Sequence, residues 1–520
     1  MDMEKQNNLR QFFEKLKDFE LEFKEKELES IENIEISNIV KAEDEREIQK
    51  LFKCIVNILD KPYLEFYHPE KDNLKTRGVY SVKLGMVNFV LFVDENFENP
   101  WLFAQCTNFV DVIITKFSHY RIMPPMYTIV LGKLLELSEN LSSNISKIKY
   151  DTPFAGFLLN HPRPYHHFYD HLKYAYLFKK DKRLSHISYK TDDASFFIPN
   201  TWKEETAKVG VFIYPALIAN NFLNPRVNDF VKNLNEEMEK NVSKEVQEYC
   251  NLGSEGLNKY DLTLWLGITG QKRSWMEQVD GYINIIKYLL KDFKKINIYI
   301  DGMTANEGKK IRNNDDQKIF NEIKKELSEY SQCTLVSLIG EDYRTKINTC
   351  AKVDLFIANA GTGCMVPLRF CKKPGVLHSN TKLFTFRDNY PSTVKKNNKK
   401  YTIDIVDEDM QRIDFTSYHI PWQHIFNLTV DVLKAIKGTN IKYLDIPKSK
   451  EEKNKIFKRL SQKIKPEDKS ADILRKIAFV FEESGDIKTA CSLMQKAHEL
   501  KPNGPGIIKK LKEYKASLNS

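Results

Sequence analysis

Residues 354–380 read DLFIANAGTGCMVPLRFCKKPGVLHSN, and this stretch decides the fold that we expect. Its apolar run at 355–358 is bounded by turn signals, as in a strand that is covered on both faces. A glycine-containing turn follows at 359–363, and then a short helix that Lys-Pro-Gly at 373–375 ends. A second apolar strand begins at Val376. This order of strand, helix and strand predicts a parallel sheet that binds ligands at the carboxyl ends of its strands.

The turn itself is a candidate anion site. Asn359 closes the strand, and Gly361, Thr362 and Gly363 would supply amides at the N-terminus of the next helix. Free amides and the positive end of the helix dipole favour a phosphate-sized anion. The structural alternative is that the glycines only let the helix pack closely on the strand.

A second candidate site follows the strand that we expect at 262–268. Gly270, Gln271, Lys272 and Arg273 form a basic loop directly before a predicted amphipathic helix. Cations are slightly unfavourable at a helix N-terminus, so their presence there indicates an anionic partner. An arginine can bind a diphosphate through two parallel hydrogen bonds. A solvated helix N-terminus is the structural alternative.

A carboxylate follows a third predicted strand of the same region, at 333–339. Glu341 could bind a pair of ribose hydroxyls, or this turn could cap the next helix. None of these loops fits GxGxxG or GxxxxGK[ST]. The sequence therefore supports neither an NAD fingerprint nor a Walker-type ATPase site.

The other dense cluster of functional side chains is NHPRPYHHFYDH at 160–171, which holds four of the 11 histidines of the chain. Aromatic faces beside imidazole and carboxylate groups suit a sugar or another polyhydroxylated ligand. Transfer to an acceptor hydroxyl needs a general base. The candidate bases are His166, His167 and Asp170. The candidate acceptor-binding residues are Arg163, Tyr165 and Tyr169.

Two other interpretations of this cluster stay open. The loop could be purely structural, with each histidine hydrogen-bonded. His167 and His171 are four residues apart, so on a helix both could face one metal ion, and the segment 161–171 could then serve a metal-dependent hydrolase. The sequence has no HExxH and no second cluster rich in carboxylates, so we expect neither a metal site nor a tightly bound cofactor.

Length and composition set the class of protein. A chain of 520 residues with 42% hydrophobic residues suits two large globular domains and an appendage. The net charge of +9 is modest for this length and has little functional weight, although a basic surface could help binding to an anionic lipid or a nucleotide sugar. Nucleic acid is not expected, because no RRM, KH or zinc-finger pattern occurs.

The cysteines and the apolar segments bear on localisation. The 8 cysteines are scattered without a CxxC pair, which is typical of reduced thiols in the cytosol. The first residues lack the apolar core of a signal peptide, and no run of about 18 apolar residues occurs. We therefore expect a cytoplasmic protein, with any contact to the inner membrane peripheral.

Patterning along the chain predicts four parts. Residues 1–77 carry amphipathic helices, and residues 78–255 form a mixed α/β domain. Residues 256–440 alternate strand and helix with short loops, which indicates a doubly wound parallel sheet. Residues 441–520 form a basic connector followed by a helical segment.

The C-terminal helical segment resembles one tetratricopeptide (TPR) repeat. Small residues and a closing proline have the separations of that repeat, at Ala478, Gly485, Ala490, Ala497 and Pro502. Small side chains are needed where two antiparallel helices cross closely. Residues 471–504 would form the repeat and 505–518 its capping helix, which together suit a protein partner.

Residues 261–437 are similar in pattern to the donor-binding domain of GT-B glycosyltransferases. The similarity rests on QKRSW at 271–275, AGTG at 360–363 and a closing helix at 420–436. It implies an α/β fold with two Rossmann-like domains that face a cleft. The sugar nucleotide would bind mainly to the C-terminal domain, and the acceptor would enter from the N-terminal domain. No E-x7-E motif occurs within 354–380, so retaining families with that motif are not implied.

This resemblance predicts a glycosyltransferase that moves a sugar from a nucleotide-sugar donor to a saccharide, glycolipid or protein acceptor, in the synthesis of a bacterial surface glycan. Lys272, Arg273 and the amides of 361–363 would stabilise the leaving diphosphate without a metal. Direct displacement would invert the anomeric centre. The alternatives are a non-catalytic assembly protein that binds partners through the repeat, and the metal-dependent hydrolase.

Overall fold

The structure is a computed structural model, in which the chain forms a mixed α/β protein with several sheets. The chain divides into two compact units, Met1–Glu248 and Tyr249–Ser520. The predicted boundary between 255 and 256 lies outside the described residues. The structure describes residues 2–27, 45–71, 73–184, 187–190, 195–202, 209–218, 228–250, 260–270, 273–382, 391–405, 416–447, 471–483 and 486–519.

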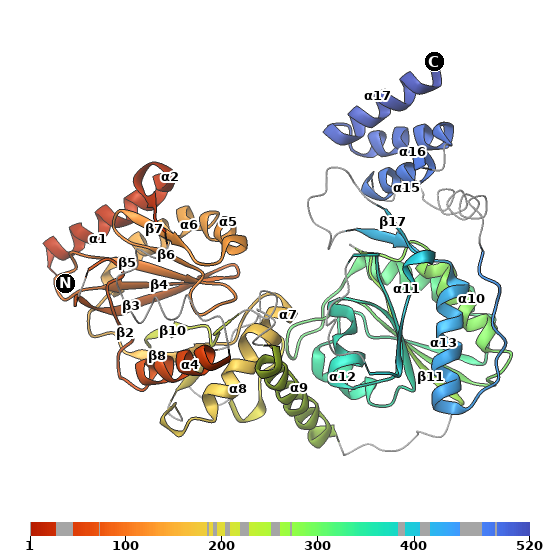
Figure 1. Ribbon diagram of the computed structural model, residues 1–520, viewed down its shortest axis with the longest axis horizontal. Helices are drawn as coiled ribbons and strands as arrows, with labels where there is room; N and C mark the ends of the chain where they lie inside the picture. Colours follow the sequence, from red (N-terminus) through yellow and green to blue (C-terminus); the bar gives the residue numbers. More distant parts are fainter. Residues whose placement is uncertain are drawn as a thin grey trace. The chain divides into compact units, whose positions relative to one another are not determined.

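The second unit is built on a six-stranded sheet (Figure 1). The strand order is β13-β12-β11-β14-β15-β16, and every neighbouring pair is parallel. The chain adds strands in one direction from β11 and in the other direction from β14, which is the order of doubly wound α/β sheets. The bounds are β11 Leu262–Gly267, β12 Ile296–Asp301, β13 Cys333–Ser337, β14 Leu355–Asn359, β15 Gly375–His378 and β16 Val394–Lys396.

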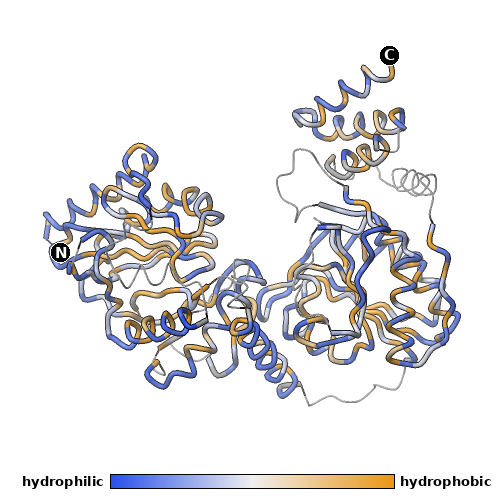
Figure 2. The backbone as a smooth tube through the Cα atoms, viewed as in Figure 1, coloured by the Kyte–Doolittle hydropathy of each residue, from blue (hydrophilic) through white to orange (hydrophobic). Residues whose placement is uncertain are grey.

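The central strands are apolar because helices cover them. All residues of β14 are buried, and Figure 2 shows apolar residues gathered along the strands of this unit. Helices α10, α11 and α13 share one core with strand residues such as Leu264, Ile298 and Ile357. The helices that accompany the sheet are α10 Gln278–Leu289, α11 Asn314–Leu327, α12 Tyr343–Cys350 and α13 Trp422–Lys437.

Small residues lie buried between the helices of the C-terminal segment. Ala478, Ala490 and Ala497 are fully buried in one shared core, whereas Gly485 lies outside the described residues. Three of the predicted close-packing positions are therefore at helix contacts, and the assignment as a tetratricopeptide repeat stays a prediction. The described helices of this segment are α15 Ala471–Glu483, α16 Ile487–Leu500 and α17 Pro505–Asn519.

The first unit differs from the Rossmann-like domain that the resemblance implies. Its larger sheet has the order β1-β7-β6-β5-β4-β3-β2, and the neighbouring strands from β2 to β7 are antiparallel. Short turns such as 85–86 join these strands, whereas a parallel pair needs a crossover of about a dozen residues. The bounds are β1 Lys24–Glu25, β2 Glu65–Tyr67, β3 Lys75–Leu84, β4 Val87–Val93, β5 Trp101–Gln105, β6 Val112–Ile114 and β7 Ser118–Arg121.

Helix α1 covers this antiparallel sheet. Its residues Leu9, Phe12 and Phe13 are buried in the same core as the strands, so the N-terminal helix belongs to the first unit. The longer helices described in this unit are α1 Met3–Lys15, α4 Glu45–Leu59, α5 Pro124–Leu131, α6 Leu134–Ser143, α8 Lys173–Lys179 and α9 Asn228–Cys250, and α2 Phe19–Glu22 is a single turn.

A small parallel sheet, β10-β8-β9, leads into the histidine-rich segment. Its strands are β8 Phe154–Leu158, β9 Ser188–Lys190 and β10 Val211–Ile213. The turn α7 (Pro164–His166) follows β8, and the π-helix η4 (His167–Leu172) continues it into α8. An extra residue per turn in a π-helix changes which side chains face the core.

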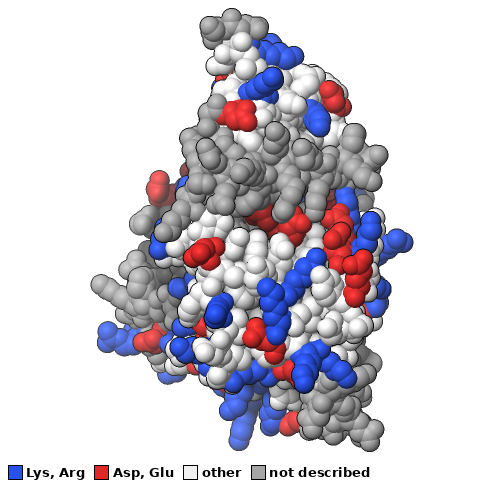
Figure 3. Space-filling view, turned by 90° about the vertical axis from the view of Figure 1, so that its right-hand side faces the viewer, with Lys and Arg blue, Asp and Glu red and all other residues white. Residues whose placement is uncertain are grey.

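Charges of both signs are intermixed on the face that Figure 3 shows. Lysine and arginine side chains lie beside aspartate and glutamate side chains there, so the net charge of +9 is not segregated into one basic patch on that face. No helix in the described part of the chain combines the length and the apolar composition that a membrane span requires.

We expect Gly375→Ala to lower the free energy of unfolding by about 1–3 kcal/mol, the usual cost of overpacking. A Cβ at this position of β15 would lie 2.5 Å from Cδ1 of Phe356 on the paired strand β14. Gly132→Ala is the control, because its Cβ would meet nothing closer than 3.5 Å. Urea unfolding followed by circular dichroism measures both, and an unchanged midpoint for Gly375→Ala would contradict the expectation.

Candidate functional site

The carboxyl ends of β11 and β14 form the point where the strand order of the sheet reverses. These strands pair directly, with Leu266 opposite Ile357. Gly267 ends β11, and a Cβ there would lie 2.8 Å from the Cβ of Ala358, so only glycine allows this close approach. In doubly wound sheets the loops that leave such a point separate and form the ligand-binding crevice.

Arg273, from the loop after β11, lies directly against the turn after β14. A Cβ on Gly361 would lie 3.2 Å from Nη2 and 3.3 Å from Cζ of the Arg273 guanidinium. The backbone of Gly361 is extended, with φ of −173°, so space rather than backbone conformation favours glycine here. The structure thus brings together the two loops that the sequence singled out.

The turn after β14 is shorter and tighter than a regular helix start. Thr362–Cys364 is a 3₁₀ turn, and Met365–Phe370 is a π-helix that contains Pro367. Proline has no amide to continue an α-helical ladder, which accounts for this irregular form. A Cβ on Gly363 would lie 2.8 Å from Oδ1 of Asn359, so Asn359, Gly361, Thr362 and Gly363 are adjacent.

Gly270 has a structural partner in this conformation. Its amide donates to Oδ1 of Asp316 at 2.9 Å, and the amide of Met303 donates to Oδ2 of the same carboxylate at 2.7 Å. Asp316 therefore ties the loop after β11 to the loop after β12. Gln271 and Lys272 lie outside the described residues.

Glu341 lies away from this point of the sheet. It follows β13, and β12 and β11 separate β13 from β14. Its carboxylate forms an ion pair with Lys310. The neighbouring Asp342 caps α12, because Oδ1 accepts a hydrogen bond of 2.9 Å from the amide of Thr345. The capping alternative therefore describes this turn in the structure.

A buried ion pair at the end of β12 was not expected from the sequence. Lys346 of α12 is fully buried, and its Nζ lies 2.6 Å from Oδ1 of Asp301. The same Nζ donates to the carbonyls of Gly302 and Met303 at 3.0 and 3.1 Å. Burial raises the pKa of Asp301 to about 6, against the lowering effect of Lys346. The pair fixes the loop beside the candidate site.

In the first unit, His166 and Asp170 form a carboxylate–imidazole pair. Nδ1 of His166 lies 2.5 Å from Oδ2 of Asp170, and the side chains are 15% and 0% exposed. An ionised carboxylate only accepts hydrogen bonds, so beside ionised Asp170 the Nδ1 atom of His166 is the donor. The neutral ring then has Nε2 as its proton acceptor, which is the arrangement of a general base oriented by an acid.

The other predicted residues of this segment divide between core and surface. His167 is fully buried, and its Nε2 lies 2.9 Å from the carbonyl oxygen of Phe197. Tyr169 is also buried, and its hydroxyl donates to Glu239 at 2.9 Å. Tyr165 is partly exposed and stacks on Tyr169, and Arg163 is exposed. Of the candidate bases, His166 with Asp170 is the pair whose geometry suits proton transfer.

A metal site was the alternative for these histidines. Nε2 of His167 faces the Phe197 carbonyl, while Nε2 of His171 lies 3.3 Å from the Cys106 carbonyl. Those nitrogens therefore contact two different backbone oxygens. Within the part of the chain that is described, no group of three or more His, Cys, Asp or Glu side chains is placed to hold a metal ion.

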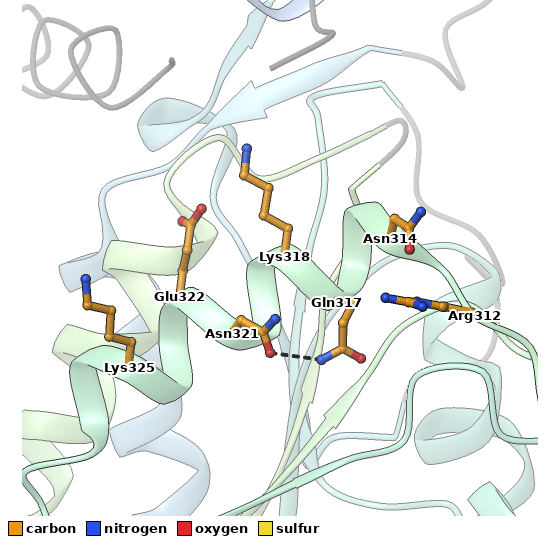
Figure 4. A pocket seen from close by; sticks show the side chains of 7 residues that line it. All are labelled: Arg312, Asn314, Gln317, Lys318, Asn321, Glu322 and Lys325. Atoms are coloured by element: carbon orange, nitrogen blue, oxygen red, sulfur yellow. Dashed lines mark hydrogen bonds between the residues drawn. The ribbon is translucent and has the colours of Figure 1, made fainter. Parts of the chain in front are cut away.

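A shallow groove of about 370 Å³ runs along the outer side of α11 (Figure 4). None of the predicted site residues lines it. Gln317 and Asn321 are hydrogen-bonded to each other at 3.0 Å in its wall. The lining residues are Arg312, Asn314, Gln317, Lys318, Asn321, Glu322 and Lys325.

Comparison with known proteins adds little to this geometry. No family model matches the sequence, and no curated protein matches it. One similar solved structure is that of an S. aureus TarM mutant in complex with fondaparinux, alpha-GlcNAc-glycerol and UDP. The identity is 12% over 82% of this chain and 86% of that chain, with a TM-score of 0.21. At this identity and TM-score the similarity assigns no function to this chain.

We expect His167→Gln to reduce the loss of stability in mild acid. Burial lowers the pKa of His167 to about 4, whereas an unfolded histidine titrates near 6.5. As the pH falls below 6.5, the unfolded chain takes up the proton first, so stability is lost between about 6.5 and 4. From pH 7.5 to 5.0 the loss from this residue is about 2 kcal/mol. Urea unfolding at both pH values measures it, and an equal loss in the variant would contradict this assignment.

Proposed function

We propose that this protein is a glycosyltransferase that transfers a sugar from a nucleotide-sugar donor, which its second unit would bind in the manner of the GT-B donor-binding domain. The observation that carries the proposal is the contact of the Arg273 guanidinium with Gly361 at the reversal point of a parallel sheet. It supports binding of a diphosphate there, because a guanidinium is a bidentate phosphate ligand and this edge of such sheets binds ligands.

The proposed chemistry at the donor site follows from the charge that develops on the leaving group. Cleavage of the sugar–phosphate bond develops negative charge on the leaving nucleoside diphosphate. Arg273, Lys272 and the amides of 361–363 would stabilise that charge, and preorganised donors of this kind give large rate effects without a metal. Asn359 would contact the donor from the same turn. No tightly bound cofactor is needed for this reaction.

The first unit holds the candidate general base. His166, with Nδ1 held by Asp170, would take the proton of an acceptor hydroxyl at Nε2. Direct attack opposite the leaving diphosphate inverts the anomeric centre. Tyr165 and Arg163, which are accessible, would contact a saccharide, glycolipid or protein acceptor in surface-glycan synthesis in the cytoplasm.

We expect Arg273→Ala to weaken donor binding about 10–100-fold, the cost of losing a charged hydrogen-bonding partner. Isothermal titration with UDP-, GDP- and dTDP-linked sugars measures the affinity. Arg312→Ala is the matched control, since it removes an exposed arginine from the groove on α11. If none of the donors binds, or if Arg273→Ala binds them as the unchanged protein does, the proposal is wrong and the non-catalytic alternative is favoured.

His166→Ala should lower kcat about 10²–10⁴-fold and leave donor affinity within about twofold. The variant removes the proton acceptor but no group of the donor site. His498→Ala, in α16, is the control for loss of a histidine elsewhere. Turnover is measured as release of the nucleoside diphosphate. Unchanged kcat in His166→Ala would remove this residue from the mechanism.

A further inference from the structure

The three residues that follow Arg273 contact a strand that lies much further along the chain. The short strands β17 (Ile403–Ile405) and β18 (Ser417–His419) are antiparallel, and Tyr418 of β18 bridges to the loop after β11. The amide of Met276 donates to the carbonyl of Tyr418 at 2.9 Å, and the amide of Tyr418 donates to the carbonyl of Ser274 at 3.0 Å. These two backbone hydrogen bonds hold the loop that carries Arg273 against β18 on its C-terminal side.

Trp275 adds a packed anchor to these bonds. Its ring is buried, and Nε1 donates to the carbonyl of Ile420 at 2.9 Å. A Cβ on Gly281 of α10 would collide with this ring, so the helix has room for the indole only because residue 281 is glycine. The indole thus holds the loop between α10 and the chain that follows β18.

A buried contact between two ionisable side chains lies beside this attachment. Glu277 stands directly before α10, and its carboxylate faces Nδ1 of His419 in β18. The two side chains are 5% and 0% exposed. A buried carboxylate is costly unless a cation or hydrogen-bond donor compensates it, and the imidazole of His419 is the ionisable group that the structure places against Glu277.

Arg273 itself has a backbone conformation that needs such support. Its φ is +53°, in the left-handed region, which costs a residue other than glycine about 1–2 kcal/mol. Strain of this kind persists only where the surrounding structure holds it, and it is common at ligand sites. The strained residue is also the one whose guanidinium lies on Gly361.

We infer that Glu277 and His419 are positioning residues, which act through Arg273 and hold its guanidinium over Gly361 for an anionic diphosphate. The inference rests on the proposed function, because it assigns these two residues to the same donor site. Neither residue needs to touch the diphosphate. Their contribution to its binding should therefore disappear when the guanidinium is removed.

A double-mutant cycle tests this inference in the full-length chain, with inorganic pyrophosphate as the titrated ligand. Glu277→Gln keeps the side-chain size and removes the charge. We expect it to weaken pyrophosphate binding about tenfold when Arg273 is present and less than about twofold in the Arg273→Ala background. Glu65→Gln is the matched control, since it breaks an ion pair with Arg77 in the first unit.

The outcomes separate the two proposals. If Arg273→Ala leaves pyrophosphate binding unchanged, the proposed donor site itself is wrong. If Arg273→Ala weakens binding, but Glu277→Gln weakens it equally in both backgrounds, the donor site stands and the positioning role is overturned.

A second variant tests whether weaker pyrophosphate binding arises from the positioning of Arg273 or only from a loss of stability. His419→Gln leaves the Glu277 carboxylate buried without its partner and can prevent folding. The double variant Glu277→Gln/His419→Gln removes both ionisable side chains, so its thermal midpoint should return to within a few degrees of the single Glu277→Gln variant or above it, while pyrophosphate affinity stays about tenfold weakened. Affinity that recovers together with the thermal midpoint would show a purely structural pair and overturn the inference.

Discussion

The reversal of strand order between β11 and β14 is the constraint on which the second unit depends. All six strands of its sheet are parallel, so the carboxyl ends of the strands lie along one edge. The chain leaves β11 toward β12 and leaves β14 toward β15, so the loops after these two strands diverge. Gly267 allows the two strands to approach closely just before that point. Arg273 and Gly361 meet where the loops diverge, and the proposed chemistry follows from that meeting.

Buried charged groups, rather than regular secondary structure, hold the loops at this edge. Asp316 accepts from two loop amides, Lys346 donates to the loop after β12, and Glu277 faces His419. Low local dielectric makes each of these contacts strong when complete and costly when broken. Loops fixed in this way suit a reaction in which donors must already point at the developing charge, because no reorganisation is then needed as the bond breaks.

The sequence predicts the second unit better than the first for a physical reason. Apolar runs such as 355–358 identify buried strands, and alternation with helices implies parallel pairing. The sequence therefore predicts that the loops after β11 and β14 lie at the same edge of the sheet. Periodicity does not say which strand pairs with which, and the antiparallel sheet of the first unit was missed. The short turn at 85–86 was the available signal for a hairpin.

The roles of individual side chains were harder to predict from the sequence than the positions of the strands. His166 and His167 are adjacent, yet one reaches Asp170 and the other faces the core, because successive side chains of a helix point in different directions. No local pattern relates Lys346 to Asp301, since their contact depends on how α12 packs on the sheet. The left-handed backbone of Arg273 likewise arises from tertiary contacts and not from residue type.

The buried pair of Asp301 and Lys346 also limits how this sequence can change over generations. Losing either partner alone leaves an isolated charge in the interior, at a cost of about 3–5 kcal/mol, which is a large share of the stability of most domains. Asp301 and Lys346 must therefore be substituted together, so related chains should keep both residues or neither.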